Sequence, residues 1–109
     1  MDQALTSLRQ AGIQHYIPRA LLARAALRRA MGDLGRARAD LDEALSIATR
    51  GGMRLFEADC RLEYARLHLA RGEKELAQAN LGAARKMVEE MGYHRRDEEM
   101  REIEEQLET

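Results

Sequence analysis

Apolar residues recur at helical spacing over most of the chain. Alanine and leucine return every three or four positions among charged residues, and this period places them on one face of an α-helix. The clearest example is the run Leu34, Ala37, Leu41, Ala44, Leu45 and Ala48. Glycines interrupt the pattern, as residues that end helices do. The pattern predicts an all-α protein of about six helices, at 2–11, 18–31, 34–50, 55–71, 74–91 and 97–108.

Two kinds of glycine junction separate the predicted helices. In the first kind, Gly32 or Gly72 is followed by an acidic residue, and Asp33 can cap the helix that begins there. In the second kind an apolar residue follows the glycine, which is typical of a helix ended by a left-handed glycine with a hydrophobic contact beyond it. The second kind comprises Gly12, Gly52 and Gly92.

The whole pattern repeats with a period of 40 residues. A shift by this period superposes identical glycines, alanines or leucines at positions 12/52/92, 4/44/84, 32/72, 25/65, 37/77 and 41/81. Such a fixed period is typical of solenoids built from stacked helix pairs. We therefore predict a single domain, 1–109, that consists of a half-repeat at 1–12, repeats at 13–52 and 53–92, and a C-terminal capping helix at 97–108.

The third copy of the repeat changes character. Glu102 and Glu105 stand where the earlier copies have leucine and alanine. Burying an unpaired carboxylate costs several kcal/mol, so no further helix is expected to pack there. The last helix keeps an inward apolar stripe of Met100, Ile103 and Leu107. We expect it to be the polar terminal cap of the array.

These residues resemble the tetratricopeptide repeat family. The shared motif is a glycine and an acid at the helix turn, then alanine, a large apolar residue and alanine at fixed spacings. It is found as Gly32, Asp33, Ala37, Leu41, Ala44 and again as Gly72, Glu73, Ala77, Leu81, Ala84, with Ala25 and Ala65 before each glycine. The resemblance covers nearly the whole chain and implies an α-solenoid of antiparallel helix pairs. The period exceeds the family's usual value of about 34, and is similar to the longer variant in C-terminal arrays of bacterial signalling ATPases and transcription regulators.

Both the first residues and the composition bear on the biological setting. Met1 falls within the second helix of a preceding repeat, so the apolar face with Ala4, Leu5 and Leu8 lacks part of its cover. We therefore expect the chain to be the C-terminal segment of a larger signalling or regulatory protein.

The net charge of −1 gives no reason to expect a membrane or nucleic acid as partner. With a single cysteine, no secretion signal and no long apolar run, the chain is predicted to be cytoplasmic.

Candidate catalytic and metal-binding groups do not assemble from this sequence. No nucleophile with a histidine partner, no pair of catalytic carboxylates and no glycine-rich phosphate loop can be built. Cys60 and His68 lie roughly 12 Å apart along one predicted helix, too far to share a metal. The stretch MGYHRRD, with His94, Arg95 and Arg96, aligns with helix junctions of the earlier copies, and its Asp97 can cap the last helix. We expect no catalysis, no cofactor and no metal.

The first helices of successive repeats should form an inner wall. Its predicted partner-binding residues are Arg19, Leu22, Ala26, Arg29, Asp59, Leu62, Arg66 and Leu69. They make an apolar strip edged with arginine, which suits an extended or helical peptide that carries acidic residues. An interpretation of equal weight is that Leu22 and Leu62 belong to the hydrophobic core and bind no partner. The carboxylate clamp of chaperone-binding members is absent, because its positions hold Leu22, Ala26, Leu62 and Arg66.

Three functions follow in order of preference. The first is a non-catalytic protein-interaction scaffold, which predicts that Arg29 and Arg66 are exposed on one continuous face; their burial in ion pairs would contradict this use of the groove. The second is a homo-oligomerisation module, with a homodimer formed through the helix at 2–11. The third and least favoured is nucleic-acid binding by the arginines of 18–38. Those arginines more readily pair with acids of the chain, as Arg36 with Asp40 and Arg38 with Asp42.

Overall fold

The computed structural model describes residues 17–108. They form five α-helices and one short 3-10 helix, without a β-strand: α2 (Ile17–Ala30), α3 (Leu34–Arg50), α4 (Arg54–Ala70), α5 (Lys74–Met91), η2 (His94–Arg96) and α6 (Asp97–Glu108). The all-α prediction is confirmed for this range, and each helix begins and ends within one residue of its predicted bounds. The helix expected at 2–11 and the junction at Gly12 lie outside the described residues.

All four described glycine junctions have the same geometry, although the sequence predicts two kinds. The φ angles of Gly32, Gly52, Gly72 and Gly92 are 83°, 66°, 74° and 68°. At each junction the residue after the glycine donates its backbone N–H to the carbonyl five residues earlier, at 2.8 to 3.0 Å. This is the bond of a Schellman cap, which glycine favours because it has no Cβ. The acid after Gly32 adds the predicted cap, since Asp33 accepts from the Arg36 backbone N–H at 3.4 Å.

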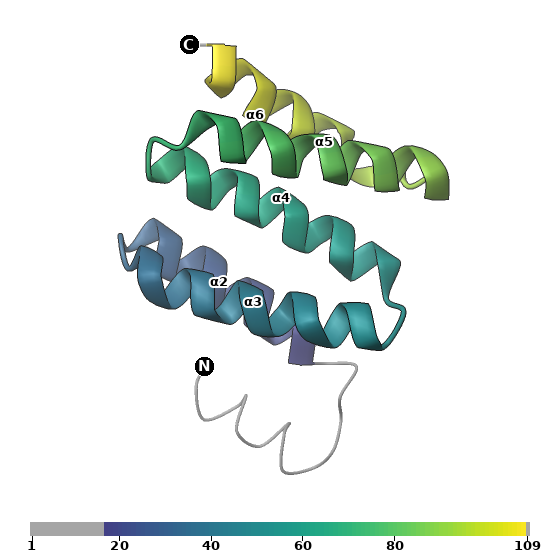
Figure 1. The fold of residues 1–109 in the computed structure, drawn as a ribbon, viewed down its shortest axis with the longest axis horizontal. Helices are drawn as coiled ribbons and strands as arrows, with labels where there is room; N and C mark the ends of the chain where they lie inside the picture. The colour runs from purple at the N-terminus through teal and green to yellow at the C-terminus, as the bar shows by residue number, and fades with distance from the viewer. Residues whose placement is uncertain (1–16, 109) are drawn as a thin grey trace.

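Consecutive helices pack side by side, and α4 occupies the centre of the molecule. In Figure 1, α4 lies between the α2–α3 pair and α5, and α6 lies beyond α5. The closest packing joins α2 with α3 and α4 with α5, while α4 also contacts α2 and α6. The molecule is elongated and flat, with extents of 43 × 32 × 19 Å.

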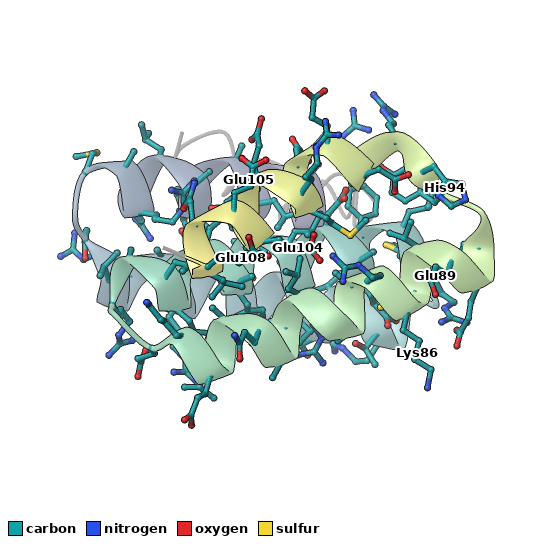
Figure 2. All side chains as sticks on the ribbon, turned by 90° about the horizontal axis from the view of Figure 1, so that it is seen from above. Lys86, Glu89, His94, Glu104, Glu105 and Glu108 are labelled. Carbon is teal, nitrogen blue, oxygen red and sulfur yellow. The ribbon has the colours of Figure 1, made fainter. Side chains whose placement is uncertain are left out.

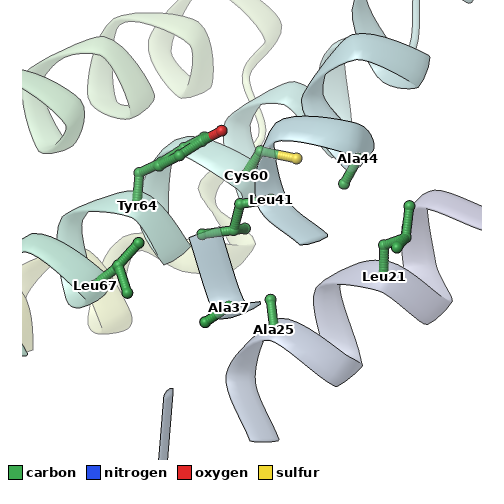
Figure 3. Packing of buried hydrophobic residues seen from close by; sticks show 8 residues of the cluster. All are labelled: Leu21, Ala25, Ala37, Leu41, Ala44, Cys60, Tyr64 and Leu67. Carbon is green, nitrogen blue, oxygen red and sulfur yellow. The ribbon is translucent and has the colours of Figure 1, made fainter. Parts of the chain in front are cut away.

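The core consists of two clusters, which share α4. The first joins α2, α3 and α4, and Figure 3 shows its eight residues, with Cys60, Tyr64 and Leu67 of α4 near Leu41 of α3. The second joins α4, α5 and α6. Alanines 40 residues apart, at 25/65, 37/77 and 44/84, are all at most 1% exposed. Their small side chains let the helix axes approach closely, as the repeat predicts.

Helix α6 has the polar character that the sequence predicts. Met100 and Ile103 are 4% and 2% exposed and belong to the second cluster, whereas Glu102 and Glu105 are exposed. Figure 2 shows Glu105 and its acidic neighbours along this helix. Asp97 does not cap the helix as expected. It already has helical backbone angles, and its carboxylate lies 3.1 Å from Nδ1 of His94.

A nearly buried carboxylate ties α2 to α3. Asp40 is 3% exposed and accepts hydrogen bonds from Arg24 and Arg28 at 2.6 to 3.1 Å. The expected pair of Arg36 with Asp40 is therefore wrong, because two arginines of the neighbouring helix occupy that carboxylate. Arg36 lies instead 3.6 Å from Asp33. The expected pair of Arg38 with Asp42 is confirmed, at 4.0 Å.

Candidate interaction groove

A groove runs along α2, α4, η2 and α6. Its larger part has a volume of about 500 Å³ and a smaller hollow of about 290 Å³ adjoins it at Arg66, which lines both. The structure brings together all eight residues that the sequence predicts for the inner wall. Six line the larger part, namely Arg19, Leu22, Ala26, Asp59, Leu62 and Arg66, while Arg29 and Leu69 line the smaller hollow. That they bind a partner stays a prediction.

Apolar side chains line the larger part of the groove together with its charged residues, and we call these apolar side chains the floor. Leu62 is 1% exposed and belongs to the core, so the alternative interpretation holds for this residue. Leu22 is only partly buried and presents surface to the groove. It is also lined by three apolar side chains outside the predicted inner wall, Leu55, Phe56 and Tyr93. Of these, Leu55 is 49% exposed, so about half of its apolar surface stays in contact with water.

Glu63 decides the charge of the groove's centre. Its side chain is 6% exposed and accepts hydrogen bonds from Arg29 at 2.7 Å and from Arg66 at 3.1 Å. Both arginines are consequently less than 30% exposed. The expectation that Arg29 and Arg66 are exposed cations is wrong, because an internal carboxylate already neutralises them. These ion pairs contradict the predicted groove for acidic peptides, in which Arg29 and Arg66 supply the positive charge.

The ion pairs continue along the groove into a chain of alternating charges. Arg66 also lies 3.7 Å from Glu99, Glu99 lies 3.3 Å from Arg96, and Arg96 donates to Asp59 at 3.0 Å. The hydrogen bond to Asp59 raises the pKa of Arg96 above its usual value. We call this chain the charge ladder; it consists of Arg29, Glu63, Arg66, Glu99, Arg96 and Asp59. It joins α2, α4, η2 and α6, and it fixes the shape of the groove.

Repeat comparison gives no signal for most of this ladder. Glu63 aligns with Ala23 and Ile103, so its polar character is confined to one copy. Arg96 replaces the aromatic residues of the earlier copies, and the sequence indicates only a terminal turn without cover. In the structure Arg96 is two-thirds covered and holds the turn against α4. The local signals of pairs in this ladder are the three-residue spacings of Glu63 with Arg66 and of Arg96 with Glu99.

Two arginines of the groove stand outside the ladder. Arg19 on α2 and Arg95 on η2 both line the larger part and are both exposed. Within residues 17–108, neither has an ion-pair partner. At the other end, Glu102 lines the smaller hollow, is exposed, and likewise has no ion-pair partner in the described range. The ends of the groove therefore differ in charge.

The remaining reactive side chains are held in structural contacts. Burial raises the pKa of the Cys60 thiol to about 12, so it stays protonated at neutral pH and is a poor nucleophile. His68 is 4% exposed, stacks on Tyr64 and lies 3.0 Å from Glu73 through its Nδ1. Tyr64 donates a short hydrogen bond to Asp42. No group of three or more histidine, cysteine or acidic residues within the described range is placed to hold a metal.

Other proteins do not assign a function to this groove. No family model matches the chain, and comparisons with curated proteins and with solved structures also return no match. Among the described helices, none is both long enough and apolar enough to cross a membrane.

Proposed function

We propose that residues 17–108 are part of an α-solenoid of the tetratricopeptide type that acts as a non-catalytic protein-interaction module. Its groove binds a peptide, or a segment of a partner domain. The solenoid arrangement is supported by the 40-residue period and by the equal burial of alanines one period apart. A binding role is supported by the position of the groove, which lies across the first helices of successive repeats.

The observation that carries this proposal is a groove whose sides are joined by ion pairs and whose apolar side chains are partly left in water. Leu55 is half exposed beside Phe56 and Tyr93, and a partner's apolar side chain would remove this surface from water. The charge ladder holds the walls from three helices, so little reorganisation is needed on binding. A preorganised site gains affinity because fewer side chains must be ordered. The volume of about 500 Å³ suits a few side chains of an extended or helical segment.

A peptide selection with matched variants tests the proposal. The probe is a phage-displayed library of random peptides, selected on the protein and then measured as synthetic peptides by fluorescence anisotropy. Ala26→Trp fills the groove, while Ala79→Trp places the same side chain on an exposed position of α5 outside it. Selected peptides should bind Ala26→Trp at least tenfold more weakly and Ala79→Trp unchanged. A library without enriched peptides, or equal binding to both variants, would contradict the proposal.

Self-association is a second candidate function, because two apolar side chains at the C-terminal end of α2 are exposed. Leu27 and Met31 are 50% and 73% exposed and lie one helical turn apart. Leu67, one period after Leu27, is fully buried, so this position packs against a neighbour elsewhere in the repeat. Sedimentation over a wide concentration range tests the idea. A mass that rises with concentration, and that Leu27→Glu returns to the monomer, supports self-association; a constant monomer mass rules it out.

A further inference from the structure

The groove is electrically polarised from one end to the other. Within the described residues, Arg29, Arg66 and Arg96 are balanced by Asp59, Glu63 and Glu99, three positive against three negative charges. What remains is Arg19 with Arg95 at one end and Glu102 at the other. The middle is thus neutral, and the excess charges, of opposite sign, sit at the two ends.

The positive end is built for a carboxylate beside an apolar group. Arg19 approaches from α2 and Arg95 from η2, and the apolar side chains of Leu55 and Tyr93 line the same part of the groove. Two guanidinium groups can each donate paired hydrogen bonds to a carboxylate. The other end disfavours a second carboxylate, because Glu102 has no ion-pair partner in the described range and the arginines of the same hollow, Arg29 and Arg66, are already paired with Glu63 and Glu99. Attraction at one end and repulsion at the other together select partners.

We propose that the groove binds a peptide segment in one direction, with a carboxylate side chain between Arg19 and Arg95 and a lysine or arginine beside Glu102. Apolar residues between them cover the floor. This inference rests on the proposed function and specifies the chemistry of the partner. The peptide's acidic residue is thus expected at Arg19 and Arg95, and no longer at Arg29 and Arg66 as the sequence predicts.

The length of the groove sets the spacing of the two charges. Arg95 in η2 and Glu102 in α6 are seven residues apart, so their backbones are separated by roughly 10 Å along these two helices. An extended peptide spans this length in about three residues, and a helical one in about seven. The bound segment therefore carries its acid and its base about three or about seven positions apart, according to its conformation.

The test uses the random phage-displayed library with charge-reversed proteins. On the natural sequence, enriched peptides should carry an acidic residue and a basic residue in one fixed order at the spacing above. When Arg19→Glu/Arg95→Glu is used, selection should enrich a basic residue at the peptide position that carries the acid on the natural sequence. When Glu102→Lys is used, selection should enrich an acidic residue at the position that carries the base. Arg36→Glu, an exposed charge on α3 outside the groove, is the control and should leave the selection unchanged.

Direct affinities complete the test. A synthetic peptide from the selection should bind Arg19→Glu/Arg95→Glu about tenfold or more weakly, and added salt should weaken its binding to the natural sequence. Thermal melts of each variant confirm folding; these side chains are exposed, so the melting temperature should hold. Two results overturn this inference and leave the proposed function intact. In the first, peptides lose binding to Ala26→Trp but carry their acidic and basic residues in no fixed order. In the second, the order of the acidic and basic residues stays the same on the charge-reversed variants. Failure to enrich any peptide overturns both.

Discussion

Removal of the Asp40 carboxylate tests how α2, which forms one wall of the groove, is held against α3. Asp40→Ala leaves Arg24 and Arg28 without the acid that accepts four hydrogen bonds from them. Taking one partner from a buried ion pair typically costs about 3 to 5 kcal/mol, because the remaining charge stays buried. The arginine side chains are 13% and 20% exposed and each also interacts with a further group, so we expect the lower value of about 3 kcal/mol.

Urea denaturation followed by circular dichroism measures this loss. A cost of about 3 kcal/mol lowers the midpoint by roughly 1 M urea or more, given usual slopes of about 1–3 kcal/mol/M. Asp40→Asn keeps the volume and isolates the charge. The control is Glu90→Ala, which breaks an exposed pair with Arg54 at 2.9 Å and should cost less than about 1 kcal/mol. If Asp40→Ala costs no more than Glu90→Ala, the buried ion pair does not hold α2 against α3.

Three further predictions concern buried groups. The Cys60 thiol, with its pKa raised to about 12 by burial, should react with a thiol reagent at pH 8 far more slowly than in urea; equal rates would contradict its burial. Burial, with the hydrogen bond to Asp42, raises the pKa of Tyr64, so its phenol should stay protonated in an absorbance titration until the protein unfolds. Stability should then fall above pH of about 10, where the unfolded tyrosine ionises, and fall less in Tyr64→Phe. Leu67→Ala should cost about 2 to 5 kcal/mol in urea and Leu27→Ala clearly less, since the first side chain is fully buried and the second half exposed; equal losses would refute this contrast.

The helices and their order follow from local rules in the sequence. A period of three to four residues fixes which face of each helix is apolar, and glycine marks each end because it readily takes a positive φ. The repeat then carries core positions from one copy to the next, so Ala25 and Ala65 are equivalent and both buried. The repeat also predicts which residues lie on the wall of the groove, because residues at matching positions of neighbouring repeats face the same side.

The charge of the groove was decided by the tertiary structure. Glu63 lies 34 positions from Arg29 in the chain, and the two meet only because α2 and α4 pack together. Nothing in the sequence near Arg29 indicates that its charge is already balanced. The same holds for Asp40, whose partners come from a neighbouring helix instead of its own. Apolar periodicity is a property of each helix alone, whereas an ion pair depends on the distance between side chains of different helices. The sequence by itself therefore determined the helices and the wall, and the packing determined which arginines remain available at the groove's end.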